Sequence, residues 1–257
     1  MRGIITISLV TLRESLRSKI FAGLIIFLGL FLIFSVYVST LSLGNAARFI
    51  LNTGMLGLAM VCLAVSILFG LFSLYQEKER NELYVLLNRV KRSSYLLGRF
   101  LGTTYIIILF SIAAGLGIFV LTWIFGGQAA PQLFWACYWT VLEFTMITAI
   151  GLMFYALNVG FTLNSLIVLG IFIMGHSMAE AVKSIILLGR LGSPVHLYLV
   201  KAIAILFPNF DMFDFRLSIV HAEALPWGRV ALSTIYWALY LAALLAAGSA
   251  FMSKRDV

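Results

Sequence analysis

The residues that could carry chemistry form one charged stretch, residues 75–100, and one isolated acid, Glu143. The stretch is YQEKERNELYVLLNRVKRSSYLLGRF, and charges of both signs in so short a segment suit contact with another protein. Glu143 lies alone within the apolar run WTVLEFTMIT. The sequence contains no G-x-x-x-x-G-K-[ST], H-E-x-x-H, C-x-x-C or G-x-S-x-G motif, which excludes an ATP-hydrolysing site within this polypeptide and predicts a non-catalytic chain.

The elements that hold these residues are expected to lie in a membrane. Hydrophobic residues make up 62% of the chain and charged residues 11%, with a mean hydropathy of +1.06, far from the balance of soluble domains. A bilayer core about 30 Å thick requires roughly 20 apolar residues for each helical crossing. Six runs of suitable length are 20–41, 49–75, 100–125, 133–157, 163–178 and 230–252.

Unbroken apolar runs predict helices, because barrel strands would give short segments of alternating hydrophobicity. The expected fold class is therefore an all-α integral membrane protein, with residues 1–257 forming a single transmembrane domain. The fourth and fifth spans are separated only by ALNVGFTLN, where Asn158, Gly160 and Asn164 predict a tight turn without charge. Charged residues interrupt the N-terminal apolar run, which also lacks a small-residue cleavage site, so we expect it to be retained.

Lysine and arginine are distributed unequally between the two sides of this predicted membrane. Six crossings place both termini on one face, which carries twelve of these residues against six on the other. The positive-inside rule therefore predicts that both termini and the loop 76–99 are cytoplasmic. The net charge of +8 follows from this asymmetry. No nucleic-acid partner is expected, because no basic patch interleaved with aromatics lies on a soluble domain.

Three further regions are expected to form helices that do not cross the membrane. Residues 4–19 resemble an interfacial elbow helix, with Arg13 and Arg17 away from an apolar face. That apolar face consists of Ile5, Leu9, Leu12 and Leu16. A short amphipathic cytoplasmic helix is predicted within the charged stretch from Leu83, Leu86, Leu87 and Val90. The outer cap region, 179–228, contains two apolar runs, AVKSIILLGRL and LYLVKAIAILF, that suit interfacial or re-entrant helices.

Glu143 is the one ionisable residue deep within a predicted span. A charge at bilayer depth costs about 2.5 to 3.5 kcal/mol or more, so its carboxyl group is expected to be protonated, paired or facing a wet cavity. Two interpretations stay open: a substrate or proton path, and an interhelical hydrogen bond. A secondary transporter would usually show several such groups and broken helices related by a repeat, and neither is evident in the sequence.

The remaining polar and sulfur-containing residues do not predict a metal site. The three histidines, His176 among them, fall on the outer side near methionines, but their spacing matches no coordination motif for copper. Cys62 and Cys137 fall inside predicted spans, where we expect them to be small packing residues. Gly98 and Gly102 would allow two helices to approach closely, although such pairs are too common in membrane helices to identify an interface.

The charged stretch resembles the cytoplasmic loop of ATP-binding-cassette permeases of the type-2 exporter family. That loop tends to contain E-x-E-x-G-T-L, a leucine pair, P-x-S-R and a hydrophobic-G-K ending. The matching residues here are Glu77, Glu79 and Arg80 at the acidic entry, Leu86 and Leu87 as the pair, Arg92 as the arginine, and Gly98 with Arg99 at the loop end. Asn81 and Arg89 stand where the family usually has glycine and proline, so the turn geometry is expected to differ there.

Other segments are similar to the same family. They are the elbow TLRESLRSKIF, the six-span layout and the C-terminal FMSKRDV. The outer segment FPNFDMFDFRLSIVH resembles the outer loop of the subgroup named copper-enzyme-maturation permeases, a name that does not specify what is moved.

The resemblance implies a transmembrane permease subunit of an ATP-binding-cassette exporter in the bacterial cytoplasmic (inner) membrane. Two permease subunits, as a homodimer or a heterodimer, would form the pathway and rest on two separate ATPase subunits. ATP and Mg²⁺ would be held by those subunits, so no cofactor is expected in this chain. The implied ATPase-coupling interface is Glu77, Glu79, Arg80, Leu83, Leu86, Leu87 and Arg92.

Other classes of function remain open. The loop could be only a solvated segment that obeys the positive-inside rule, although topology does not require its acids, which favours a coupling role. The chain could also be a membrane scaffold that assembles a peripheral complex without transport. A third possibility is an ion-coupled secondary transporter that uses Glu143. Nothing in the sequence selects the substrate.

Overall fold

The computed structural model describes residues 2–40, 45–80, 91–127, 131–187, 208–221 and 227–254. Within these ranges the chain forms helices and no strand. The elements are α1 (Arg2–Arg17), α2 (Lys19–Thr40), α3 (Ala46–Ile67), the π-helix η1 (Leu68–Phe72), α4 (Ser73–Glu79), α6 (Arg92–Gly126), α7 (Leu133–Ala156), α8 (Phe161–Leu187), the 3₁₀ helix η2 (Phe210–Phe213), α10 (Arg216–Val220) and α11 (Trp227–Lys254).

Five helical segments of the described chain are long and apolar enough to cross a membrane. They are Lys19–Thr40, Ala46–Glu79, Arg92–Gly126, Leu133–Ala156 and Trp227–Ser253, and Phe161–Ser177 is a shorter apolar helix. The prediction of an all-α, multi-pass membrane protein is therefore confirmed. The fifth predicted span, 163–178, lies within α8, and the count of six crossings stays a prediction.

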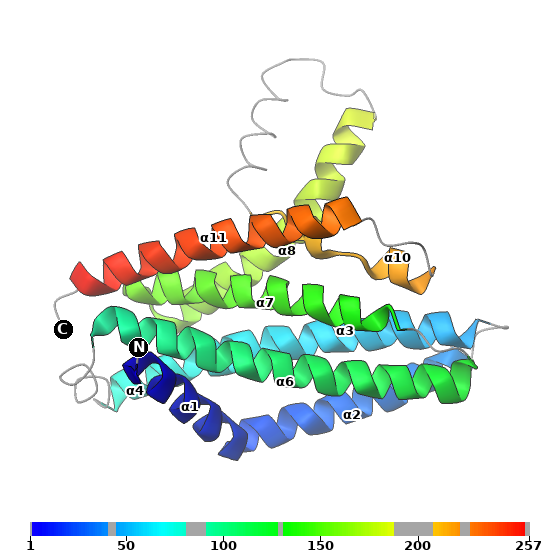
Figure 1. Ribbon diagram of the computed structural model, residues 1–257, viewed down its shortest axis with the longest axis horizontal. Helices are drawn as coiled ribbons and strands as arrows, with labels where there is room; N and C mark the ends of the chain where they lie inside the picture. The colour runs from blue at the N-terminus through cyan, green and yellow to red at the C-terminus, as the bar shows by residue number, and fades with distance from the viewer. Residues whose placement is uncertain are drawn as a thin grey trace.

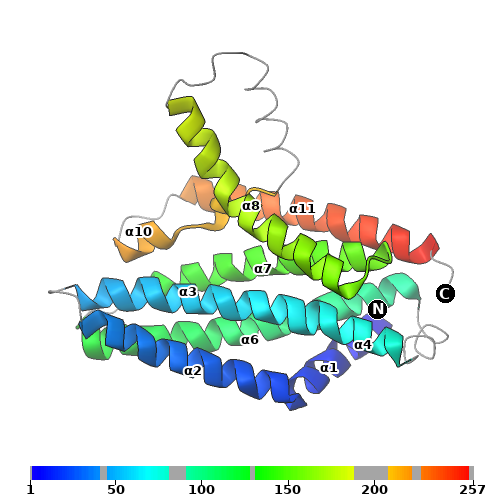
Figure 2. The same ribbon diagram turned by 180° about the vertical axis from the view of Figure 1, so that it is seen from behind.

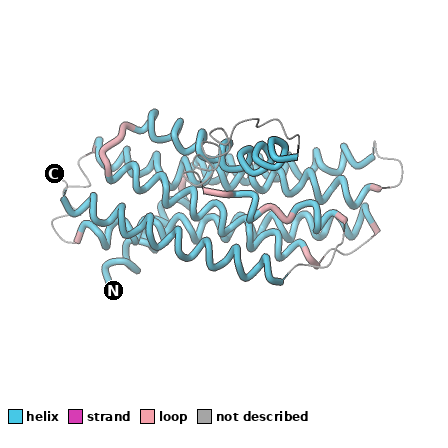
Figure 3. Tube along the Cα trace, turned by 90° about the horizontal axis from the view of Figure 1, so that it is seen from above, coloured by secondary structure: helices cyan, strands magenta, loops and turns pink. Residues whose placement is uncertain are grey.

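The ends of the long helices gather into two groups. The start of α1, the end of α4, the start of α6 and the end of α11 lie at one end of the bundle, here called the termini end (Figure 1). The end of α2, the start of α3, the end of α6 and the start of α7 lie at the other end, as does α10 (Figure 2). Seen from above, the long helices run along a common direction (Figure 3). This arrangement brings the two sides of the charged loop close to α1.

Helix α7 occupies the centre of the bundle. Within its most apolar 18-residue stretch, 72% of the residues are buried, whereas the corresponding stretches of α2 and α11 are each 11% buried. Every residue of α7 from Leu142 to Leu152 is buried. Exposed apolar residues on α2 and α11 are expected in a bilayer, since lipid replaces water around them. Glu143 is thus held by the most enclosed helix among those described.

A tight turn joins α7 to α8, as the sequence predicts. Asn158 adopts a left-handed conformation with φ of 64°, which asparagine tolerates better than most residues. Its side-chain oxygen accepts a hydrogen bond from Lys78 of α4 at 2.8 Å. Asn164, expected within the turn, lies instead in the first turn of α8, where it is fully buried and donates to the carbonyl of Gly151 and to Tyr75.

Helix α8 leaves the bundle, and its C-terminal part projects away from the other helices (Figures 1 and 2). It is continuous to Leu187, so the beginning of the predicted outer run AVKSIILLGRL extends α8. The second predicted outer run, residues 197–207, lies outside the described residues. The segment that follows returns to the bundle and buries three aromatic side chains, Phe210, Phe213 and Phe215, which we call the aromatic plug.

Candidate functional site

The predicted coupling interface is divided by the structure into inward and outward residues. Glu79 and Arg80, at the end of α4, are exposed, and Arg92 is half-buried where α6 begins. Glu77 is turned inward, with its side chain only 12% exposed. The remaining members of the predicted interface, Leu83, Leu86 and Leu87, lie outside the described residues, as does the short helix predicted around them.

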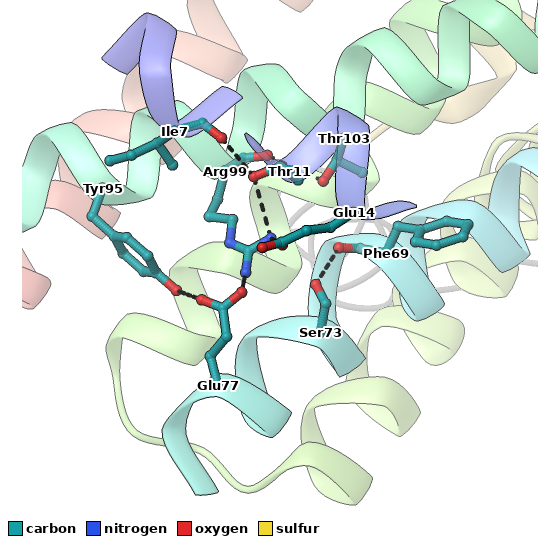
Figure 4. A network of polar contacts seen from close by, with 9 residues as sticks. All are labelled: Ile7, Thr11, Glu14, Phe69, Ser73, Glu77, Tyr95, Arg99 and Thr103. Carbon is teal, nitrogen blue, oxygen red and sulfur yellow. Dashed lines mark hydrogen bonds and ion pairs between the residues drawn. The ribbon is translucent and has the colours of Figure 1, made fainter. Parts of the chain in front are cut away.

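Arg99, predicted at the end of the loop, is the centre of a buried polar network that we call the Arg99 cluster. Helix α6 begins at Arg92, two turns before the predicted span, and this places Arg99 inside the helix with a side chain 5% exposed. Its guanidinium group forms an ion pair with Glu77 and lies 3.9 Å from the carboxylate of Glu14 (Figure 4). A buried charge needs such a partner, because burial removes its hydration.

Two hydroxyl groups complete the Arg99 cluster. Tyr95 donates a hydrogen bond to the second carboxylate oxygen of Glu77 at 2.6 Å. Arg99 Nη1 donates to Thr11 Oγ1 at 3.2 Å, and Thr11 in turn donates to the carbonyl of Ile7 at 2.9 Å (Figure 4). The cluster therefore joins α1, α4 and α6 at the termini end.

Helix α1 packs on α6 through two glycines. A Cβ atom on Gly98 would lie 2.7 Å from Ile7 Cβ, and one on Gly102 would lie 2.6 Å from Thr11 Cβ and 3.0 Å from the Ser8 carbonyl oxygen. Contacts this short are not sterically allowed, so only glycine permits the observed approach of the two helices. The small-residue pair in the sequence thus has a defined partner, the buried face of α1.

The three faces of α1 have different surroundings. Ile7, Ser8, Thr11 and Ser15 are buried. The predicted apolar face is exposed, with Ile5, Leu9 and Leu16 all open, and Arg13 and Arg17 are also exposed. A helix with one face on the bundle, one apolar face and one cationic face can lie at a membrane surface.

Glu143 lies in a second cluster, nearer the middle of the bundle. Its carboxylate is 3.4 Å from Nε2 of His176 on α8, and the residue is 9% exposed. The two side chains border a cavity of about 30 Å³, which is large enough for a water molecule. Thr140, Asp214 and Arg216 also line this cavity.

The contacts of His176 determine which ring nitrogen carries hydrogen. Nδ1 lies 3.1 Å from the carbonyl oxygen of Phe172, and since a carbonyl can only accept, Nδ1 must donate. In neutral histidine, Nε2 then presents a lone pair toward Glu143. A proton on Nε2 or on the carboxyl group would make this 3.4 Å contact a hydrogen bond. Glu143 and His176 thus form a pair that can share one proton, which we call the proton-holding pair.

The aromatic plug covers this cavity. Phe215 stacks on Trp139 with ring centroids 3.8 Å apart, and the guanidinium group of Arg229 on α11 lies over the Phe215 ring, 4.8 Å from its centroid. The indole nitrogen of Trp139 is buried without a hydrogen-bond partner among the described residues. Phe213 and Phe215 of the plug thus form an aromatic part of the wall of this cavity.

Metal-binding chemistry is not evident in the described ranges. They contain no group of three or more histidine, cysteine, aspartate or glutamate side chains that could hold a metal ion. Cys62 and Cys137 are both buried and free, in agreement with a packing role.

Sequence reasoning missed several members of both clusters. Tyr95, Thr11 and Glu14 were not assigned roles with Arg99, and His176 was not paired with Glu143. Tyr95 precedes Arg99 by four residues, a spacing that places both side chains on the same face of a helix. This proximity could have been predicted from the sequence. The remaining partners come from other helices, so their pairing required the tertiary structure.

Comparison with known proteins does not assign the chain to a family. No protein-family model matches the chain, and a search of curated proteins finds no match.

Proposed function

We propose that the chain is the transmembrane permease subunit of an ATP-binding-cassette exporter, forming its pathway as a dimer and driven by separate ATPase subunits through the loop 76–99. The observation that carries the proposal is the buried ion pair between Glu77 and Arg99. It joins the helix that enters the loop to the helix that leaves it. A loop mounted on two joined helices can transmit a push as a rigid-body movement.

The elbow helix supports the same proposal. Because α1 packs on α6 through Gly98 and Gly102 and contacts Arg99, a movement of the loop would also move α1. Among the described members of the predicted interface, the exposed Glu79 and Arg80 are then available to touch an ATPase, and Glu77 acts from within the chain.

Purification of the tagged chain from its native membranes tests this function. We expect an ATPase of separate sequence to co-purify, and the double charge reversal Glu79→Lys with Arg80→Glu should remove it. Glu77→Gln should keep the partner bound but lower the ATP hydrolysis that the reconstituted complex supports. Purification of the wild-type chain without any nucleotide-hydrolysing partner would contradict the proposal, and binding without any effect on hydrolysis would favour a scaffold.

The predicted sidedness has its own test. Cysteine introduced at Glu79, at the termini end, should react with a membrane-impermeant maleimide only from the cytoplasmic side. Cysteine at Thr40, at the opposite end, should react only from outside. The native Cys62 and Cys137 are buried and give a low background. The reverse labelling pattern would mean that the loop faces the outside, where no cytoplasmic ATPase could contact it.

A second candidate is an ion-coupled secondary transporter, and the proton-holding pair of Glu143 and His176 favours it. Intramembrane acids of this kind often mark proton paths. Liposomes that contain only this chain and a pH-sensitive dye would then show proton flux under a pH gradient. Glu143→Gln should abolish that flux, whereas absence of flux in the wild type would leave the pair as an interhelical contact.

A further inference from the structure

A polar groove lies beside the Arg99 cluster at the termini end. It has a volume of about 400 Å³, within the range of about 300 to 1,000 Å³ found for small-molecule sites. One side is formed where α1 turns into α2, by Glu14, Ser15 and Ser18. The other side is formed by η1 and α4, including Phe69 and Arg80. The groove is thus open space between the elbow helix and the helix that enters the charged loop.

The position of this groove matches a membrane boundary. Ser18 directly precedes α2, whose apolar segment begins at Lys19. The exposed apolar residues of α1, such as Leu9 and Leu16, are expected to reach lipid from the same level. The wall of the groove is correspondingly mixed, with Ile20, Leu68, Phe69 and Phe72 on its apolar part. A ligand that fits must have a polar head and an apolar body.

The charges around the groove define the head further. Glu77 also lines it, but its charge is taken up by Arg99. Glu14 is 61% exposed and only at the limit of ion-pair distance from Arg99, so its carboxylate can bind a cation. Arg80 is exposed, and among the described residues it has no ion-pair partner. One acid and one base therefore remain, which suits a ligand that carries both a cation and an anion.

We propose that the groove binds the head group of a phospholipid with a primary amine, phosphatidylethanolamine. Its ammonium group would bind Glu14, with the oxygens of Ser15, Ser18 and Gln76 as further acceptors nearby. Its phosphate would bind Arg80, since guanidinium groups bind phosphate oxygens in a bidentate manner. The π-helix η1 supplies the apolar wall against which the glycerol backbone would lie, and π-helices occur frequently at functional sites.

The acceptor-rich wall distinguishes this lipid from phosphatidylcholine. A primary ammonium group donates three hydrogen bonds, whereas the trimethylammonium group of choline donates none. Hydrogen bonds to charged groups are strong enough that their loss should change affinity by about tenfold. Phosphatidylglycerol has no cationic group. Its negatively charged head group would therefore face the carboxylate of Glu14 without a compensating ammonium group.

The test uses the full chain in phosphatidylcholine nanodiscs, titrated with lipids that carry a spin label on the acyl chain. Labelled phosphatidylethanolamine should be immobilised saturably, about tenfold more tightly than labelled phosphatidylcholine. Glu14→Gln should lower the affinity for labelled phosphatidylethanolamine to that for labelled phosphatidylcholine. Arg80→Gln should lower the affinity for both lipids. Glu79→Gln and Arg13→Gln are matched controls, because they remove exposed charges next to the groove without lining it.

Three outcomes would overturn the proposal. Immobilisation that does not saturate would indicate bulk lipid only. Equal effects of Glu14→Gln and Glu79→Gln would assign the preference to surface charge. Tighter binding of labelled phosphatidylglycerol, dependent on Arg80 alone, would define an anion site. No ATPase is needed for these measurements, so their result is independent of the proposed transport function.

Discussion

Glu77 of α4 and Arg99 of α6 form an ion pair that is almost completely buried, although 22 positions of sequence separate them. The segment between them is the charged loop, so this one contact closes the base of the loop. Two hydrogen bonds support the pair: Tyr95 donates to the carboxylate of Glu77, and Arg99 donates to the hydroxyl group of Thr11. Its removal should therefore affect the entire termini end.

Glu77→Ala should lower the free energy of unfolding by about 3 to 5 kcal/mol, because the buried Arg99 loses its close carboxylate partner and keeps only the exposed Glu14 at 3.9 Å. Thermal unfolding of the purified chain measures this loss. Glu79→Ala, which removes an exposed acid two residues away, should change stability by less than about 0.5 kcal/mol. The double variant Glu77→Leu with Arg99→Leu should be more stable than either single variant, since no charge is left unpaired. Additive losses in the double variant would show that the two residues act independently.

Gly98→Ala and Gly102→Ala should each displace α1 from α6. The new methyl groups would lie 2.7 Å and 2.6 Å from α1 side chains, and such overpacking costs about 1 to 3 kcal/mol. Spin labels at the exposed positions Arg13 and Tyr105 would report a longer separation of the two helices. Gly23→Ala and Gly29→Ala are the controls, because nothing lies within 4 Å of a Cβ atom at either position. An unchanged distance in the Gly102 variant would contradict the observed packing.

Phe215→Ala should open the aromatic plug and expose the cavity beside Glu143. The loss of a buried phenyl ring stacked on Trp139 should lower stability by about 3 to 5 kcal/mol. Hydrogen exchange of the backbone amides around Trp139 should also become faster. Phe34→Ala removes a ring that is exposed on α2 and serves as the control in detergent. Equal stability of the two variants would indicate that the plug does not seal the bundle.

Asn158→Ala should destabilise the turn between α7 and α8 by about 1 to 2 kcal/mol, because its φ of 64° is costly for a residue with a Cβ atom and no local hydrogen bond. Asn158→Gly accepts this backbone conformation and should lose less stability, even though both variants lose the contact with Lys78. Urea or thermal unfolding of both variants gives the comparison. A glycine variant less stable than the alanine variant would contradict the assignment of the loss to backbone strain at this position.

The helices themselves could be predicted from sequence because each is encoded locally. The long apolar runs and the turn at Asn158 correspond to the observed elements with shifts of a few residues. Larger shifts occur at the end of α8, where the predicted span ends at residue 178 and the helix at Leu187, and at the start of α6, where the predicted span begins at residue 100 and the helix at Arg92. The arginine at position 99 looked like a boundary, and only its partner on α4 explains why a charge can be buried there.

The candidate sites were predicted less completely. The sequence singled out Glu143, and the structure adds the partner, His176, from a helix whose register against α7 depends on packing. The resemblance to the permease loop grouped Glu77 with Glu79 and Arg80 as its acidic entry. The rotation of α4 on α6 decides that the first of them faces inward and the other two outward.

Composition and the length of the apolar runs alone determined that this chain is a helical membrane protein, because transfer into lipid depends on each segment's own residues. Which charges meet, which glycines touch a neighbour and where the grooves lie were decided only by the tertiary structure. These relationships join residues that are distant in sequence, and their free energy depends on distance and burial, which no single segment encodes.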